Sequence, residues 1–183
     1  MTGVAQSNPD SWTTRGVADL DIGLHRCDCQ PFRAPPTDHC LEKGLRVTRV
    51  YVDMVADLFH YGHIAFLKKA RALGVYLLVG IHADDVLVSY KKGKPILTME
   101  ERVDSVAGCR HVDEVLPNAP FIIDRAWIEK HDIRLVVRGD DFSQDQLEYF
   151  YKVPIEMGIF RTVPYTPGIS TSEIIRRVID AGA

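Results

Sequence analysis

Short apolar runs typical of β-strands alternate with amphipathic runs typical of helices from Leu45 to the end of the chain. The run at 75–81 is almost continuously apolar, as expected of a strand buried on both faces of a parallel sheet. Further strand-like runs lie at 46–52, 112–116, 133–137 and 159–163, and helical runs lie at 63–73, 98–109, 125–131, 144–151 and 171–181. The alternation predicts an α/β fold: a Rossmann-like, doubly wound parallel sheet of about five strands with flanking helices.

Residues 1–44 differ from the rest of the chain. They hold four of the ten prolines and show no sustained helical or strand period, which predicts an irregular N-terminal arm before a domain at 45–183. Side chains that could ligate zinc occur in this arm: His25, Cys27, Cys29, His39 and Cys40. Their spacing is not that of a standard zinc motif, so an arm with incidental cysteines is the favoured interpretation.

The composition of the 183-residue chain excludes several classes of protein. The net charge of -3 gives no general attraction to nucleic acid or to an anionic membrane. No apolar stretch approaches the roughly 20 residues needed to span a bilayer, and the first residues lack the order of a secretory signal. We therefore expect a cytoplasmic protein without nucleic-acid or membrane partners. Any affinity for phosphate must come from a local cluster of basic groups.

The most informative local string is His60-Tyr61-Gly62-His63, which follows the first predicted strand and opens the first predicted helix. Gly62 lets the backbone approach a ligand closely, and a helix N-terminus offers free N–H groups to phosphate. The two imidazoles can both donate hydrogen bonds to charge that develops on a phosphoryl group. The string alone leaves a metal pair or two surface histidines open as well.

Two further segments have the chemistry of phosphate sites. Gly168-Ile169-Ser170-Thr171-Ser172 places a glycine turn and hydroxyl groups at the start of the last predicted helix. Simple helix capping explains most such strings, and triphosphate binding is the alternative. The second segment is the lysine-rich run 91–94, followed by Arg102 in the next predicted helix. A lysine run is usually a solvated loop, but its position after a buried strand, beside the other two motifs, favours a phosphate role.

Together these segments resemble the cytidylyltransferases that make CDP-alcohols, a family of the nucleotidyltransferase superfamily. The resemblance spans about 47–179 and is carried by ordered strings: Arg49-Val50-Tyr51-Val52-Asp53, Asp57-Leu58-Phe59-His60-Tyr61-Gly62-His63, Val79-Gly80-Ile81-His82-Ala83-Asp84, Lys92-Gly93, Glu101-Arg102, Cys109-Arg110-His111-Val112-Asp113-Glu114-Val115, Asn118-Ala119-Pro120, Gly139-Asp140-Asp141 and the 168–172 string. The strings 57–63 and 101–115 are most similar to those of choline-phosphate and ethanolamine-phosphate cytidylyltransferases.

The resemblance implies transfer of a cytidylyl group from CTP to a small phosphorylated alcohol or amino-alcohol, of the phosphoethanolamine or phosphocholine type. His60 and His63 would stabilise the transition state, and Lys92 would bridge the α-phosphate of CTP and the substrate phosphate. Asp53 would face the substrate alcohol or amine. Nucleotide-binding roles would fall to Asp57, Gly62, Arg102, Asp140, Asp141, Gly168, Ile169, Ser170 and Thr171, with Arg102 holding phosphate. Mg²⁺ would bridge phosphate oxygens, mostly through water, and the chain would form a homodimer.

The chain departs from the family pattern most clearly at the last motif, where Tyr165 stands in place of an arginine. Arg161, four residues earlier, could supply the lost charge, or Tyr165 could face the second substrate. Met54 and Ala56 also replace a glycine and an aromatic residue. Glycerol phosphate or a small phosphonate therefore stays open as the substrate. An adenylyltransferase of the same superfamily and a nucleotide-binding domain without activity stay open too.

Overall fold

The computed structural model describes residues 48–84 and 94–182. The predicted arm at 1–44, its cysteines and histidines, and Lys92 lie outside the described residues. The division of the chain into an arm and a domain therefore stays a prediction.

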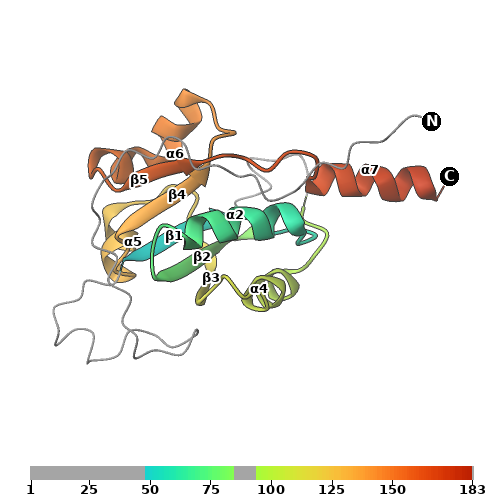
Figure 1. Cartoon of the computed structure of the whole chain (residues 1–183), viewed down its shortest axis with the longest axis horizontal. Coiled ribbons are helices and arrows are strands. Elements are labelled where there is room, and N and C mark those ends of the chain that lie inside the picture. Colours follow the sequence, from blue (N-terminus) through green and yellow to red (C-terminus); the bar gives the residue numbers. More distant parts are fainter. Residues whose placement is uncertain (1–47, 85–93, 183) are drawn as a thin grey trace, which may run out of the picture.

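The described residues form one five-stranded parallel sheet in the order β3-β2-β1-β4-β5 (Figure 1). Its strands are β1 Arg49–Met54, β2 Tyr76–His82, β3 Glu114–Ala119, β4 Leu135–Gly139 and β5 Phe160–Val163. The chain runs outward from β1 to β3 and then returns to place β4 on the other side of β1, which is the doubly wound order. The predicted fold class is confirmed. The strand predicted at 112–116 begins later and continues through Pro117, which is tolerated because β3 is an edge strand.

The helices connect the strands as predicted, and each begins at a polar N-cap residue. They are α2 Tyr61–Arg71, α4 Met99–Ala107, α5 Arg125–Lys130, α6 Gln144–Glu156 and α7 Thr171–Ala181. The expected capping box of α4 is present: Thr98 N–H donates to Glu101 Oε2 at 2.8 Å, and Glu101 N–H donates to Thr98 Oγ1 at 3.3 Å. The start of α4 can be predicted from the sequence because the capping box is a local interaction.

Helix α6 runs past its predicted end at 151 and is kinked there. Pro154 lies inside the helix, and Tyr151 has non-helical dihedrals of φ -122° and ψ 18°. A proline cannot donate to the carbonyl four residues earlier, and the freed carbonyl of Phe150 instead accepts the backbone N–H of Ile123 at 3.2 Å. The kink accompanies a buried Tyr151, which reaches the end of β1.

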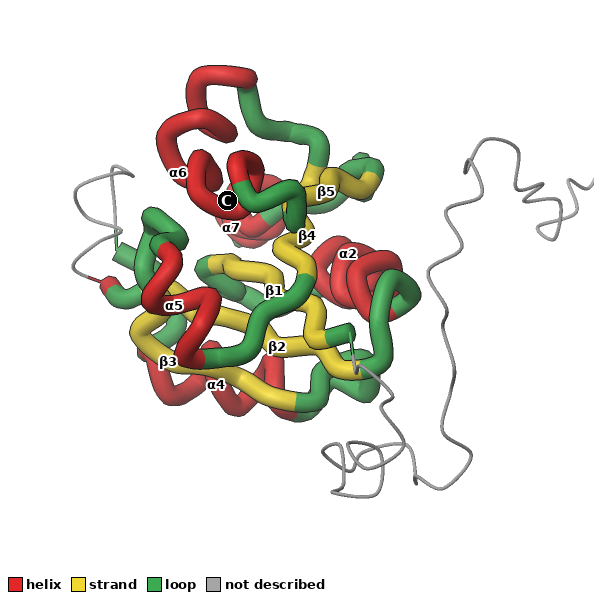
Figure 2. The backbone as a smooth tube through the Cα atoms, turned by 90° about the vertical axis from the view of Figure 1, so that its left-hand side faces the viewer, coloured by secondary structure: helices red, strands yellow, loops and turns green. Residues whose placement is uncertain are grey.

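Two hydrophobic cores lie on opposite faces of the sheet. Val50 and Val52 of β1 pack with α2 and α4, and Tyr51 packs with α5 and α6. Figure 2 shows α2 and α5 on opposite sides of β1. Because successive side chains of a strand point to opposite faces, Asp53 follows Tyr51 onto the face covered by α5 and α6. His82 and Arg138 fall on that same face by alternation with Ile81 and Val137, which belong to the first core.

Helix α7 extends away from the body of the sheet and buries no residue completely (Figure 1). The first helical residue, Thr171, ties the helix to the β1–α2 loop, because its hydroxyl donates to the Asp57 carbonyl at 2.9 Å. Among the described residues, no helix is both long and apolar enough to cross a membrane.

Candidate active site

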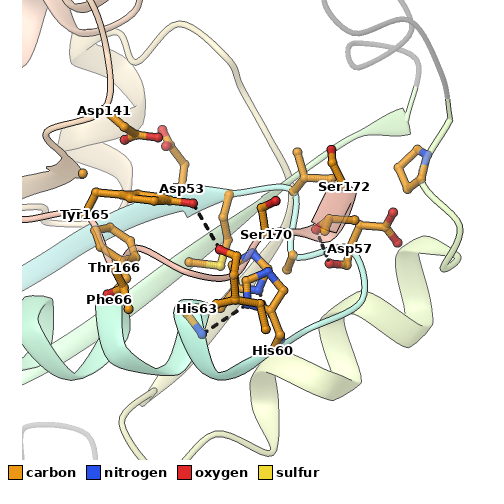
Figure 3. Close-up of a pocket in the computed structure, with 18 of the residues that line it drawn as sticks. Asp53, Asp57, His60, His63, Phe66, Asp141, Tyr165, Thr166, Ser170 and Ser172 are labelled. Atoms are coloured by element: carbon orange, nitrogen blue, oxygen red, sulfur yellow. Dashed lines mark hydrogen bonds between the residues drawn. The ribbon is translucent and has the colours of Figure 1, made fainter. Parts of the chain in front are cut away.

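A cavity of about 530 Å³ opens beside the carboxyl ends of β1 and β4. Four segments contribute most of its wall: 53–57 at the end of β1, residues of 60–66 at the start of α2, residues of 138–141 at the end of β4, and residues of 165–175 before and within the first turns of α7 (Figure 3). β1 and β4 are the neighbours at which the strand order reverses. Ligands of doubly wound sheets bind at that place.

His60 and His63 form a reciprocal capping box at the start of α2. The Gly62 N–H donates to His60 Nδ1 at 3.2 Å, and the His60 N–H donates to His63 Nδ1 at 3.3 Å. The rings stack with their centroids 3.9 Å apart (Figure 3). Burial lowers the pKa of His60 below its ordinary value, which favours the neutral ring. Because Nδ1 of each ring accepts a hydrogen bond, this geometry assigns the ring proton to Nε2 in both histidines. The local fold thus prepares two Nε2–H donors at the cavity.

Gly62 is required by close packing. A Cβ atom at this position would lie 2.9 Å from Ile169 Cγ2, closer than real Cβ atoms approach such a neighbour, and 3.0 Å from His60 Nδ1, which is tighter than most real Cβ contacts. Gly62, which the sequence predicts to let a ligand approach, therefore also lets the Ile169 side chain and the His60 ring pack closely against the start of α2.

For the cytidylyl transfer that the sequence predicts, Gly62→Ala should displace the His60 ring and lower kcat/KM for CTP by about tenfold to a hundredfold, because small misplacements of positioning groups have costs of that order. Steady-state pyrophosphate release measures the effect. Gly108→Ala is the matched control, since a Cβ there would meet its nearest atoms at 3.6 Å at the end of α4. Equal losses in both variants would contradict the role given to Gly62.

The loop between β1 and α2 holds two non-glycine residues at positive φ. Ala56 and Leu58 have φ of 60° and 45°, and such conformations cost roughly 1–2 kcal/mol each. Asp57 anchors the loop between them. Its carboxylate accepts the backbone N–H groups of 96 and 97 at 3.0 Å each, and its carbonyl accepts the Thr171 hydroxyl. Asp57 therefore positions the cavity wall, and its contact with the nucleotide stays a prediction.

The N-terminus of α7 supplies backbone donors to the same cavity. Gly168, with φ of 87°, makes the preceding turn, and Ser170 Oγ caps the helix by accepting the Glu173 N–H at 3.1 Å. The first N–H groups of a helix have no partner inside the helix. Those of Thr171 and Ser172, which line the cavity, are therefore suited to an anion at the positive end of the helix dipole.

Tyr165 braces two of the predicted nucleotide-binding segments. Its backbone N–H donates to Asp140 Oδ1 at 2.7 Å, and its hydroxyl donates to the Ile169 carbonyl at 3.2 Å. Tyr165 and Asp141 line the cavity, whereas Asp140 is not part of its wall (Figure 3). The structure thus gives Asp140 a positioning role and gives Tyr165 a place beside the ligand space.

Arg102 is a correction to the expectation from sequence. Its side chain is completely buried and does not line the cavity. Nη1 donates to the Val55 and His82 carbonyls at 2.8 and 3.1 Å, and Nη2 pairs with Asp84. A guanidinium held in this way ties the ends of β1 and β2 to α4 and is not available to phosphate.

The expectation for Arg161 also lacks support. Arg161 is exposed on β5 and lies outside the cavity wall, so it is not placed to supply the charge that Tyr165 lacks. Lys94 lines the cavity, although the sequence favoured Lys92, which lies outside the described residues.

Arg138 is a cavity residue that sequence reasoning missed. Its Nη1 donates to the Asp53 carbonyl at 2.9 Å and to Asp53 Oδ1 at 3.1 Å, and Tyr151 donates to the same Oδ1 at 2.6 Å. The guanidinium carbon lies 4.1 Å from the ring centre of Phe142. His82 completes the cluster, with Nε2 at 3.9 Å from Asp53 Oδ1. The sequence feature that could have indicated Arg138 is its position at a strand end, directly before Gly139-Asp140-Asp141.

The buried His82 and the partly buried His60 predict a loss of stability in acid. Desolvation lowers the pKa of His60 and, despite the nearby Asp53 carboxylate, that of His82. The unfolded chain, whose histidine pKa is about 6.5, then binds more protons than the folded chain. The two histidines should therefore make their whole contribution to the free energy of unfolding above about pH 6.5. That contribution should decrease as the pH falls toward the lowered pKa values. Urea unfolding at pH 7.5, 6.5 and 5.5 measures this free energy. In His82→Gln it should decline less steeply with falling pH. An unchanged decline would contradict the assignment to His82.

Paired imidazoles and a helix N-terminus at the switch point of a doubly wound sheet are features suited to a phosphate ligand in an α/β domain. The family model for cytidylyltransferase-like proteins matches residues 54–177. The chain is 46% identical over 136 residues to ethanolamine-phosphate cytidylyltransferase of Dictyostelium discoideum, covering 72% of this chain and 38% of that protein. It is 37% identical over 151 residues to choline-phosphate cytidylyltransferase of Saccharomyces cerevisiae, covering 81% of this chain and 34% of that protein. The chain belongs to the cytidylyltransferase-like family.

The chain spans between 32% and 41% of the length of the first three curated relatives it matches. A lipopolysaccharide core biosynthesis protein from Thermoplasma volcanium GSS1 has a similar structure, with a TM-score of 0.55 and 22% identity, covering 68% of this chain and 100% of that one. This structural likeness supports the fold alone.

Proposed function

We propose that this chain transfers a cytidylyl group from CTP to a small phosphorylated alcohol or amino-alcohol and releases pyrophosphate. The observation that carries the proposal is the meeting of two imidazole donors and the N-terminus of α7 around one cavity. Relatives named for ethanolamine phosphate and choline phosphate support the reaction class.

The proposed step needs no nucleophile from the protein. An oxygen of the substrate phosphate attacks the α-phosphorus of CTP in line; the new P–O bond forms as the bond to the bridging oxygen breaks, and that oxygen leaves with pyrophosphate. Catalysis is then positioning and charge stabilisation. The Nε2–H groups of His60 and His63 donate to phosphate oxygens as their charge grows. The backbone donors of α7 bind the triphosphate, and Lys92 is proposed to bridge the two reacting phosphates.

Magnesium is part of this proposal as a partner of CTP. Among the described residues, no three His, Cys, Asp or Glu side chains gather as a metal cage, and the carboxylate of Asp57 is engaged by backbone N–H groups. Mg²⁺ typically keeps several waters and binds through substrate phosphates, where it would neutralise phosphate charge. The residues present fit that mode of binding, in which triphosphate and water hold the ion.

Turnover against a panel tests the proposal. Pyrophosphate release is measured with CTP or ATP, each with phosphoethanolamine, phosphocholine, glycerol phosphate and 2-hydroxyethylphosphonate. Release that requires CTP and one phosphorylated partner is the expected result. A requirement for ATP would favour an adenylyltransferase, and CTP binding without release on any partner would favour a domain without activity.

A homodimer and a cytoplasmic location also belong to the proposal, on the sequence grounds given above. Light scattering should give about twice the chain mass of 20.6 kDa. A monomer at working concentration would contradict the dimer.

A further inference from the structure

The end of the cavity at Asp53 is already occupied by a cation of the protein itself. Arg138 pairs with Asp53 through two hydrogen bonds of Nη1, and its guanidinium stacks on the face of Phe142. A carboxylate and an aromatic face are the two features with which proteins recognise an ammonium group. Here one arginine engages both.

The Arg138–Asp53 pair is largely buried, so its charge balance affects which ligands can bind beside it. Asp53 is 1% exposed, whereas the side chain of Arg138 is 20% exposed and lines the cavity. In a setting of low dielectric, the guanidinium offsets the carboxylate and would repel a second cation. Asp141 also lines the cavity but is exposed, so water screens its charge.

The hydrogen-bond chemistry of the pair favours a group that both donates and accepts. Among the described residues, Asp53 Oδ2 has no hydrogen-bond partner although it is buried, and Arg138 can only donate. A hydroxyl can donate to a carboxylate and accept from a guanidinium. An ammonium can only donate, and a quaternary ammonium can do neither.

We propose that Arg138 determines substrate specificity, and that it selects a second substrate whose far end is an uncharged hydroxyl rather than an ammonium. This inference rests on the proposed cytidylyl transfer and names its substrate class: a small phosphate or phosphonate that carries a hydroxyl group.

The test uses two substrates that differ only at the far end, 2-hydroxyethyl phosphate and phosphoethanolamine. With the full chain and CTP, kcat/KM for the hydroxyl compound should exceed that for the ammonium compound by at least about tenfold, since like charges brought together in a site are strongly disfavoured. Arg138→Met removes the guanidinium that pairs with Asp53 in the cavity wall, so the ratio should move toward phosphoethanolamine by at least about tenfold.

Arg134→Met is the matched control, because Arg134 is an exposed arginine just before β4 that pairs with Asp132; its ratio should equal that of the parent chain. A parent chain that prefers phosphoethanolamine, or a ratio that Arg138→Met leaves unchanged, would overturn the inference. The parent ratio decides even where Arg138→Met does not fold. If the proposed function itself is wrong, no pyrophosphate appears with either compound. Calorimetric titration of both compounds then tests the inference by binding alone. Tighter binding of phosphoethanolamine would overturn it.

Discussion

His63→Gln is expected to fold like the parent chain and to lose about 10²–10³ in kcat, the usual cost of removing one donor to a developing charge. Glutamine at the third helical position can keep the capping box, because its side-chain oxygen can accept the His60 N–H that His63 Nδ1 accepts now. The variant therefore removes the Nε2–H donor and spares the helix start. Single-turnover release of pyrophosphate at saturating CTP measures the loss.

His63→Ala separates the two contributions. It removes the donor and the capping bond together, so it should lose the same activity and also about 1 kcal/mol of stability. Activity retained in His63→Gln but lost in His63→Ala would show that the histidine acts only through the capping box. The proposed catalytic role would then be withdrawn.

Arg102→Met is expected to lower the free energy of unfolding by about 3–5 kcal/mol, because it removes a completely buried guanidinium that donates to two backbone carbonyls and pairs with the partly exposed Asp84. The carbonyls of Val55 and His82 would lose their hydrogen bonds, and Asp84 would lose its partner. Urea unfolding of the full chain measures the loss.

The control for this loss is Arg134→Met, an exposed arginine whose replacement should change stability by no more than about 0.5 kcal/mol. If Arg102→Met instead kept its stability and raised KM for CTP, the sequence expectation of a phosphate-binding Arg102 would be right and the structural role wrong.

Local features were predicted well because their causes are local. The alternation of strand-like and helical runs was enough for the doubly wound sheet, and the 171–181 helix was predicted with its observed bounds. The Thr98–Glu101 capping box was also predicted from neighbouring residues. The end of α6 was missed, because helix continuation past the Tyr151 kink depends on Phe150 finding a partner in Ile123, a contact between distant segments.

The sequence by itself determined which segments meet at the carboxyl edge of the sheet and that imidazoles, hydroxyl groups and a helix start gather there. Only the tertiary structure decided which arginine faces the cavity. Arg102 bonds to Val55, 47 residues away, and is buried; Arg138 pairs with Asp53, 85 residues away, and stays in the wall. Both arginines have the same chemistry, so no local pattern separates them. The partners and burial of a side chain depend on contacts between segments that only the fold brings together.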